Sequence, residues 1–226
     1  KKMSKVVLVV AAHPDDEALG CAGTIAKHIS SGDSVHIMFM TNGVGARDIA
    51  SDSDIKNRQA AANNVSNILG ITSIQNCDFP DNKMDTIPLL RVVKSVESVI
   101  NKIQPDIVYT HHIGDLNIDH QLTHKAVVTS CRPTPNFCVQ EIYTFEVLSS
   151  TEWNTPGYFP FVPNRYVDIS DFIDVKRKIL EEYIHEMNQS THSRNIDNVI
   201  CLNALRGHSV GVNYAESFAI IRSVQK

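Results

Sequence analysis

A continuous apolar run that stops abruptly at a cluster of charged residues constrains this chain more than any other feature. Residues 6–12 read VVLVVAA, the pattern of a strand buried on both faces of a parallel sheet. The run is followed by His13, Pro14, Asp15, Asp16 and Glu17. Pro14 lacks a backbone N–H and favours extended geometry in the residue before it, so we expect the strand to end here. In open α/β sheets, ligands bind at this carboxyl end of the central strands.

The acidic cluster needs a physical reason to exist. Three adjacent carboxylates repel one another, and beside a buried strand they also lose hydration. A bound divalent cation removes both penalties, because His nitrogen and Asp oxygen atoms are ordinary zinc ligands. The alternative is a solvated acidic turn in which Asp15 or Asp16 caps the following helix. A third ligand from elsewhere in the chain would favour the metal site.

Alternating strand and helix patterns predict the fold class. Apolar strands are predicted at 6–12, 34–40, 74–79, 107–110, 141–148 and 166–169, and helices at 18–29, 56–69, 88–103, 124–131, 172–187 and 195–207. This order predicts an α/β protein, a three-layer α/β/α sandwich with a Rossmann-like, mostly parallel sheet. We expect one domain over residues 1–226. No GxGxxG or Walker-type loop follows the first strand, which argues against a dinucleotide cofactor.

Composition excludes several classes of partner. The net charge of −4, without a run of Lys or Arg, argues against nucleic-acid binding. No apolar stretch approaches the roughly 20 residues of a membrane span. Residues 1–10 superficially suggest a signal peptide, but the run is short and has no cleavage site. The five cysteines are scattered and lack a CxxC, which is typical of reduced thiols in a cytoplasmic protein.

A second polar cluster follows the strand predicted at 107–110. Residues 111–124 read HHIGDLNIDHQLTH. Because the carboxyl ends of parallel strands lie at the same edge of a sheet, this segment meets the first cluster and offers the missing ligand. The pair HPDDE and DxNxDHxxxH resembles the LmbE-like family of zinc-dependent N-deacetylases, which includes the deacetylases of glycosylphosphatidylinositol precursors and of the mycothiol and bacillithiol pathways. Further segments that look like the family are TNG at 41–43, PDN at 80–82, FEVLSSTEWN at 145–154 and RGxxxGxxYAESF at 206–218.

The resemblance implies a division of roles among these residues. It assigns one zinc ion to His13, Asp16 and His120. It leaves Asp15 unligated as the general base, and places Asp119 as a carboxylate that orients a metal-binding imidazole. Three protein ligands leave a position for water, whose pKa zinc lowers to about 7. Asp15 would take a proton as the water attacks an amide carbonyl, and return one to the departing amine.

One position departs from the family pattern. Asn117 stands where many relatives have a histidine that stabilises the oxyanion. An amide donates a hydrogen bond but transfers no proton and carries no charge. We therefore expect Asp15 to act as the sole acid and base, with His111, His112 or His124 as alternatives. His124 itself is expected to line the site through a hydrogen bond rather than to bind metal.

Three residues are candidates for substrate binding, and each has a simpler interpretation. Arg47 resembles a family position that contacts hydroxyls or phosphate, but it also fits a solvated loop. Asp81 suits a sugar hydroxyl or a plain turn, and only one of His111 and His112 can face the cleft; His111 is the residue that we assign to it. Three further residues are expected to have other roles: Arg58 as a helix-surface charge or salt-bridge partner, Glu216 as a structural group, and Ser209 as no nucleophile, because no histidine follows its GxSxG pattern.

Together these features predict a cytoplasmic, bacterial, zinc-dependent hydrolase that removes an N-acyl group, most simply acetyl, from an amino sugar or glycoconjugate. Neither a nucleic acid nor a membrane is an expected partner. The oligomeric state stays open, and relatives often form homo-oligomers. The alternatives are a non-catalytic sugar-binding module of the same fold and a zinc esterase or amidase that acts on a non-sugar substrate.

Overall fold

The computed structural model describes residues 4–45, 52–135, 137–189 and 191–225. Its strands form one seven-stranded sheet in the order β3-β2-β1-β4-β5-β7-β6. The strand bounds are β1 Val6–Ala11, β2 Ser34–Thr41, β3 Ser73–Phe79, β4 Ile107–His111, β5 Glu141–Phe145, β6 Arg165–Asp168 and β7 Ala215–Ser223. The first five strands of this order are parallel, and β7 pairs antiparallel with both β5 and β6. The predicted mostly parallel sheet is confirmed.

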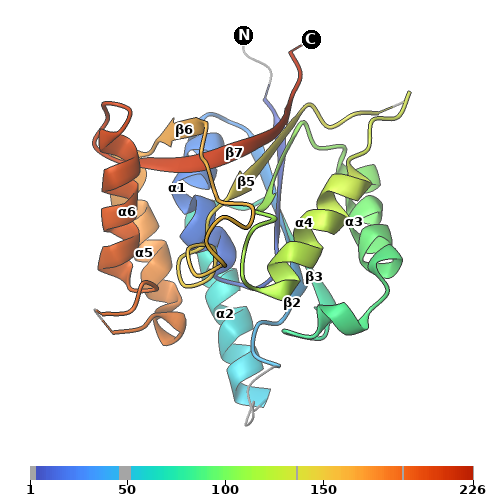
Figure 1. The fold of residues 1–226 in the computed structure, drawn as a ribbon, viewed down its shortest axis with the longest axis horizontal. Coiled ribbons are helices and arrows are strands. Elements are labelled where there is room, and N and C mark those ends of the chain that lie inside the picture. The colour runs from blue at the N-terminus through green and yellow to red at the C-terminus, as the bar shows by residue number, and fades with distance from the viewer. Residues whose placement is uncertain (1–3, 46–51, 136, 190, 226) are drawn as a thin grey trace.

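Helices cover both faces of the sheet (Figure 1). They are α1 Asp16–Ser30, α2 Asp52–Leu69, α3 Leu89–Ile103, α4 Ile118–Ser130, α5 Ile173–Glu182 and α6 Ile196–His208, with 3₁₀ turns η1 Met84–Thr86, η2 Ser170–Phe172 and η3 Ile184–Glu186. Alternate residues of β1 belong to the two cores. Val7 and Val9 pack in the core with α1, α2, α5 and α6, while Leu8 and Val10 pack in the core with α3 and α4. This double burial explains the unbroken apolar run at the start of the chain and confirms the three-layer sandwich.

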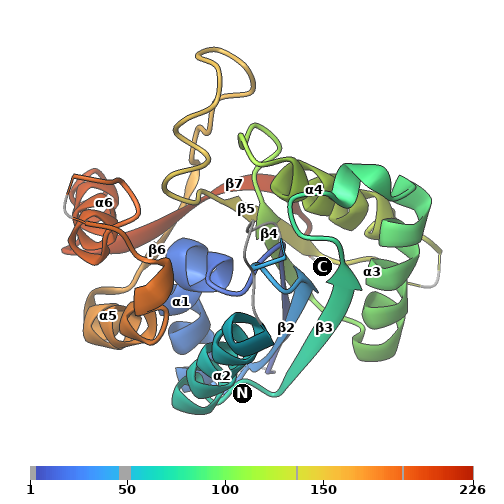
Figure 2. The same cartoon turned by 90° about the horizontal axis from the view of Figure 1, so that it is seen from below.

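The topology brings the two polar clusters together. Strands β1 and β4 are parallel neighbours at the centre of the sheet. The loop after β1 and the loop after β4 therefore leave the same edge. Figure 2 looks onto the molecule from this side, and the β5–β6 connection projects from its body at the top of the view. Among the described residues, no helix combines the length and apolar content that a membrane crossing requires.

Three elements differ from the sequence-based prediction. Helix α4 begins at Ile118 rather than His124, because the Asn117 side chain caps it by accepting a hydrogen bond from Asp119 N at 2.8 Å. The helix predicted over 172–187 is divided into η2, α5 and η3. Strand β7 was not predicted: its first four residues are buried and the rest are partly or fully exposed, so it lacks a clean alternation.

Candidate active site

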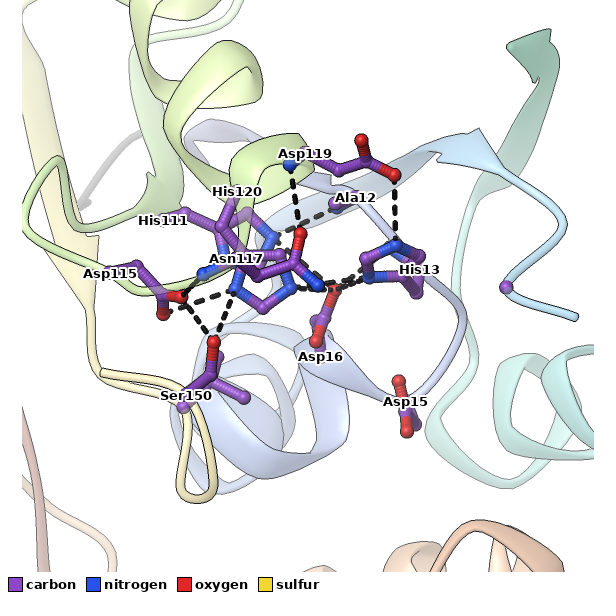
Figure 3. A network of polar contacts seen from close by, with 12 residues as sticks. Ala12, His13, Asp15, Asp16, His111, Asp115, Asn117, Asp119, His120 and Ser150 are labelled. Atoms are coloured by element: carbon purple, nitrogen blue, oxygen red, sulfur yellow. Dashed lines mark hydrogen bonds and ion pairs between the residues drawn. The ribbon is translucent and has the colours of Figure 1, made fainter. Parts of the chain in front are cut away.

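Three predicted metal ligands converge at the edge where β1 and β4 end (Figure 3). His13 follows β1, Asp16 opens α1 and His120 lies in the first turn of α4. His13 Nδ1 lies 3.2 Å from His120 Nε2, and Asp16 Oδ2 lies 3.1 Å and 3.4 Å from these two nitrogens. All three residues are buried. The earlier start of α4 thus places His120 where its ring reaches across to His13.

The donor set fits one zinc ion. Ligand atoms about 2.0–2.2 Å from a tetrahedral zinc lie roughly 3.2–3.6 Å from one another. The observed separations of 3.1–3.4 Å agree closely with that spacing. Asp16 Oδ1 is buried and has no hydrogen-bond partner among the described residues. The surrounding carboxylates also favour a cation: although burial acts to lower the pKa of His120, Asp16 and Asp115 raise it to about 9.

Carboxylates hold the far side of each imidazole. His120 Nδ1 lies 3.1 Å from Asp115 Oδ2, and Asp115 also accepts hydrogen bonds from Ser150 and Thr151. His13 Nε2 lies 3.1 Å from Asp81 and 3.3 Å from Asp119. These are the partners that fix the orientation of metal-binding imidazoles.

The sequence predicted this role for Asp119 alone, and Asp115 was missed. Asp119 does lie beside an imidazole, that of His13, and its two oxygens accept hydrogen bonds from Asn82 N and Met84 N. Asp115 begins the same DxNxDH pattern, so the spacing of that motif was a signal that could have found it.

Asp15 stands beside this cluster without joining it. Asp15 is fully buried and has a φ of 132°, a backbone conformation that costs a non-glycine residue about 1–3 kcal/mol. The carboxylate pairs with Arg58 Nη2 at 3.2 Å and with Arg194 Nη1 at 3.0 Å, and Asp15 N donates to Glu17 Oε2. Asp15 occupies the N-cap position of α1 but makes no capping hydrogen bond. The simple capped-turn interpretation is therefore wrong for Asp15.

A pocket of about 260 Å³ opens onto these residues. Its wall includes His13, Asp15, Asp81, Asn117, His120 and Arg194. Asn117 also donates from Nδ2 to Asn82 Oδ1 at 2.9 Å. The predicted base and two of the predicted ligands thus face one hollow, which is lined mostly by polar groups.

The structure places His111 away from the pocket. His111 is fully buried behind His120, with ring centroids 3.9 Å apart, and its Nε2 accepts a hydrogen bond from Ala12 N. It is not among the residues that line the pocket, and its ring stacks on that of His120, so nothing in this geometry supports its assignment to the substrate. Arg47 lies outside the described residues.

Several secondary expectations can also be compared with the structure. Arg58 is a salt-bridge partner, as one alternative held, but it is buried between Asp15 and Glu186 rather than on the helix surface. His124 bonds the His111 carbonyl. Glu216 accepts hydrogen bonds from two backbone N–H groups of α1, which is the structural role expected of it. Arg194 was missed, since nothing in the local sequence marks a lone arginine between two predicted helices.

Comparison with known proteins places the chain in a family. Residues 8–131, more than half of the chain, match the model of the PIG-L family, described as GlcNAc-PI de-N-acetylase. An uncharacterized deacetylase of Escherichia coli strain K12, YaiS, is 28% identical over 170 residues, which cover 73% of this chain and 86% of that protein. The diacetylchitobiose deacetylase of Thermococcus kodakarensis is 28% identical over 200 residues, covering 79% and 69%.

Solved structures share the fold across nearly the whole chain. The conserved protein TT1542 of Thermus thermophilus has a TM-score of 0.78 at 26% identity, covering 99% of this chain and 97% of that one. A 4-carboxy-2-hydroxymuconate hydratase of Pseudomonas putida, GalB, has the same TM-score at 20% identity, covering 98% of both chains, and at that identity only the fold is shared. The family match and the deacetylase relatives, rather than the fold, identify this chain as an N-deacetylase that belongs to the PIG-L family.

Proposed function

We propose that this protein is a zinc-dependent hydrolase that removes an N-acyl group, most simply acetyl, from an amino sugar or a glycoconjugate. The observation that carries the proposal is the convergence of His13, Asp16 and His120 beside Asp15, which lines one pocket together with His13 and His120. The diacetylchitobiose deacetylase among the relatives supports the choice of an amino-sugar substrate. Amide hydrolysis of this kind yields a carboxylate and a free amine.

The contacts support the following roles. His13, Asp16 and His120 would hold the ion, and zinc when bound would supply a Lewis acid that polarises a carbonyl and lowers the pKa of water. Asp15 takes the proton of the attacking water and delivers it to the departing amine nitrogen. Asp115 keeps the His120 ring in place, and Asp81 and Asp119 do the same for His13.

The pocket wall suits a hydroxyl-rich substrate. Asp81 and Asn117 present oxygen and nitrogen atoms beside the metal ligands, and Arg194 presents a guanidinium. Such groups hydrogen-bond sugar hydroxyls, and few apolar side chains compete for the same surface. We therefore assign Asp81 and Asn117 to the sugar ring, with Asn117 also donating to the acyl oxygen.

The test is amine release from a panel of N-acetylglucosamine conjugates and their O-acetyl analogues, with metal analysis of each preparation. We expect about one zinc per wild-type chain, zinc without turnover in Asp15→Ala, and loss of zinc in His120→Ala. His36→Ala is the matched control, because His36 bonds Ser73 at the far end of β2 and β3. Wild type that binds no zinc would refute the proposal, and zinc with turnover of esters alone would replace it with an esterase.

A further inference from the structure

Arg194 reaches the candidate active site from a segment that no sequence motif connects with it. The segment lies between η3 and α6, and the bond from Arg194 Nη1 to Asp15 Oδ2 joins residues 179 positions apart. Two hydrogen bonds connect residues near its ends: Asn188 N donates to the Arg194 carbonyl at 2.8 Å, and Asn195 Nδ2 donates to the Asn188 carbonyl at 2.9 Å. The Arg194 side chain lines the pocket together with Asp15.

The guanidinium is only partly committed to the protein. Nη1 lies 3.0 Å from Asp15, and Nε donates to Ser149 Oγ at 2.9 Å. No described residue accepts a hydrogen bond from Nη2, and the side chain is 19% exposed. Arg58, the other arginine of the pocket wall, differs because it is buried and its two terminal nitrogens pair with Asp15 and Glu186. Apart from these ion pairs, Arg58 Nε and Nη1 also lack a hydrogen-bond partner among the described residues, but both atoms are buried, so Arg194 is the arginine whose remaining donor is accessible from the pocket.

Asn117, a neutral donor in the pocket wall, is largely occupied. Asn117 Oδ1 caps α4, and Asn117 Nδ2 donates to Asn82 Oδ1. One amide hydrogen remains, and it carries no formal charge. When water adds to an amide, the carbonyl π electrons move onto oxygen, and they return when the C–N bond breaks. A fixed cation facing that oxygen lowers the barriers to these two steps.

Geometry connects Arg194 with that oxygen. A water that gives its proton to Asp15 lies about 2.6–3.2 Å from the carboxylate, and the carbon that it attacks lies about 3–3.5 Å further on. Arg194 Nη1 is 3.0 Å from the same carboxylate. Arg194 also lines the same pocket as Asp15, His13 and His120, so its guanidinium borders the space that the attacked carbonyl must occupy.

We propose that Arg194 is a catalytic residue: it holds Asp15 through Nη1 and donates from its remaining N–H groups to the acyl oxygen of the substrate as negative charge develops there. The inference rests on the proposed function, since it names the charge-stabilising group of the same reaction. It also gives the site the cation that Asn117 cannot supply.

The test compares Arg194→Ala and Arg194→Lys with Arg177→Ala, which removes a surface arginine paired with Asp197. Loss of one such donor lowers kcat by about 10²–10³-fold. We expect that loss in Arg194→Ala, with KM changed less than about threefold, zinc content unchanged and partial recovery on adding guanidinium at sub-denaturing concentration. Arg194→Lys keeps the charge but loses the planar guanidinium, so its kcat should lie between that of wild type and that of Arg194→Ala.

Three results would overturn the inference. One is kcat in Arg194→Ala within about threefold of wild type. Another is a loss carried entirely by KM, and the third is a loss that guanidinium does not relieve while the melting temperature and zinc content are normal. Wild type that releases no amine from any conjugate would instead overturn the proposed function, and that is seen before any variant is made.

Discussion

Removing the Asp115 carboxylate should weaken zinc binding although Asp115 is not itself among the proposed ligands. Asp115 Oδ2 lies 3.1 Å from His120 Nδ1, and Thr151 Oγ1 donates to it at 2.8 Å. Burial acts to raise the pKa of Asp115, but His120 beside it holds that pKa at about 2. Loss of such a partner typically weakens metal affinity 10–100-fold, or about 1.4–2.7 kcal/mol.

Two substitutions separate the charge from the hydrogen bond. Asp115→Asn keeps an oxygen that accepts from His120 Nδ1–H but loses the charge, and charge-assisted hydrogen bonds are about twice as strong as neutral ones. We therefore expect Asp115→Asn near the 10-fold end of the range and Asp115→Ala near the 100-fold end. Competition with a chromogenic chelator measures each zinc Kd directly.

A thermal or urea unfolding series at fixed zinc gives an independent measure. Bound zinc stabilises the folded state by RT ln(1 + [Zn]/Kd), so a 100-fold weaker Kd costs about 2.7 kcal/mol of zinc-dependent stability. Asp85→Ala, at an exposed position of η1, is the control. A zinc Kd in Asp115→Ala within about twofold of wild type would refute the reasoning, even if the metal-free protein were less stable.

Three further predictions concern stability away from the metal. Lys176→Met should lower the free energy of unfolding by about 3–5 kcal/mol in urea, because it leaves the buried Glu216 carboxylate without its cation, whereas Arg177→Ala should change it little. Gly207→Ala should cost about 1–3 kcal/mol, since an added Cβ would lie 2.7 Å from the Tyr214 backbone, and an unchanged melting temperature would contradict this. Burial lowers the pKa of His28 despite the Asp33 carboxylate. Neutral His28 therefore contributes to the free energy of unfolding above the ordinary histidine pKa, and this contribution is lost as the pH falls. We expect His28→Asn, which cannot be protonated, to show a smaller fall in the free energy of unfolding between about pH 7 and pH 5.

The layers of the fold could be predicted because the residue types along β1 reflect burial on both faces of the sheet. Val7 and Val9 pack in one core and Leu8 and Val10 in the other, so burial on both faces appears as an unbroken apolar run. Strand β7 has no comparable pattern of apolar residues. It is held by pairing with β5 and β6, and that pairing depends on the completed sheet rather than on its own pattern.

The candidate site likewise contains some residues that the sequence could predict and others that it could not. The loops after β1 and β4 could be brought together from sequence because the parallel sheet places the ends of both strands at one edge, and the family resemblance singled out His13, Asp16 and His120 within them. Asp115 begins the same motif, but the prediction began the helix at His124 and so did not place Asp115 beside the His120 ring. Arg194 had no local signal at all, since its place is set by how the segment before α6 packs against residues far away in the chain.

The strained backbone of Asp15 gives these observations a common physical reason. Asp15 lies immediately before α1 with a φ of 132°, outside the helical region. With this backbone the Asp15 side chain lines the pocket, whereas the Asp16 carboxylate lies beside His13 and His120. The cost of about 1–3 kcal/mol is sustained because Glu17 accepts the Asp15 N–H and two arginines hold its carboxylate. The base is thus positioned by groups from α2 and from the segment before α6, which explains why a five-residue motif alone would not complete this site.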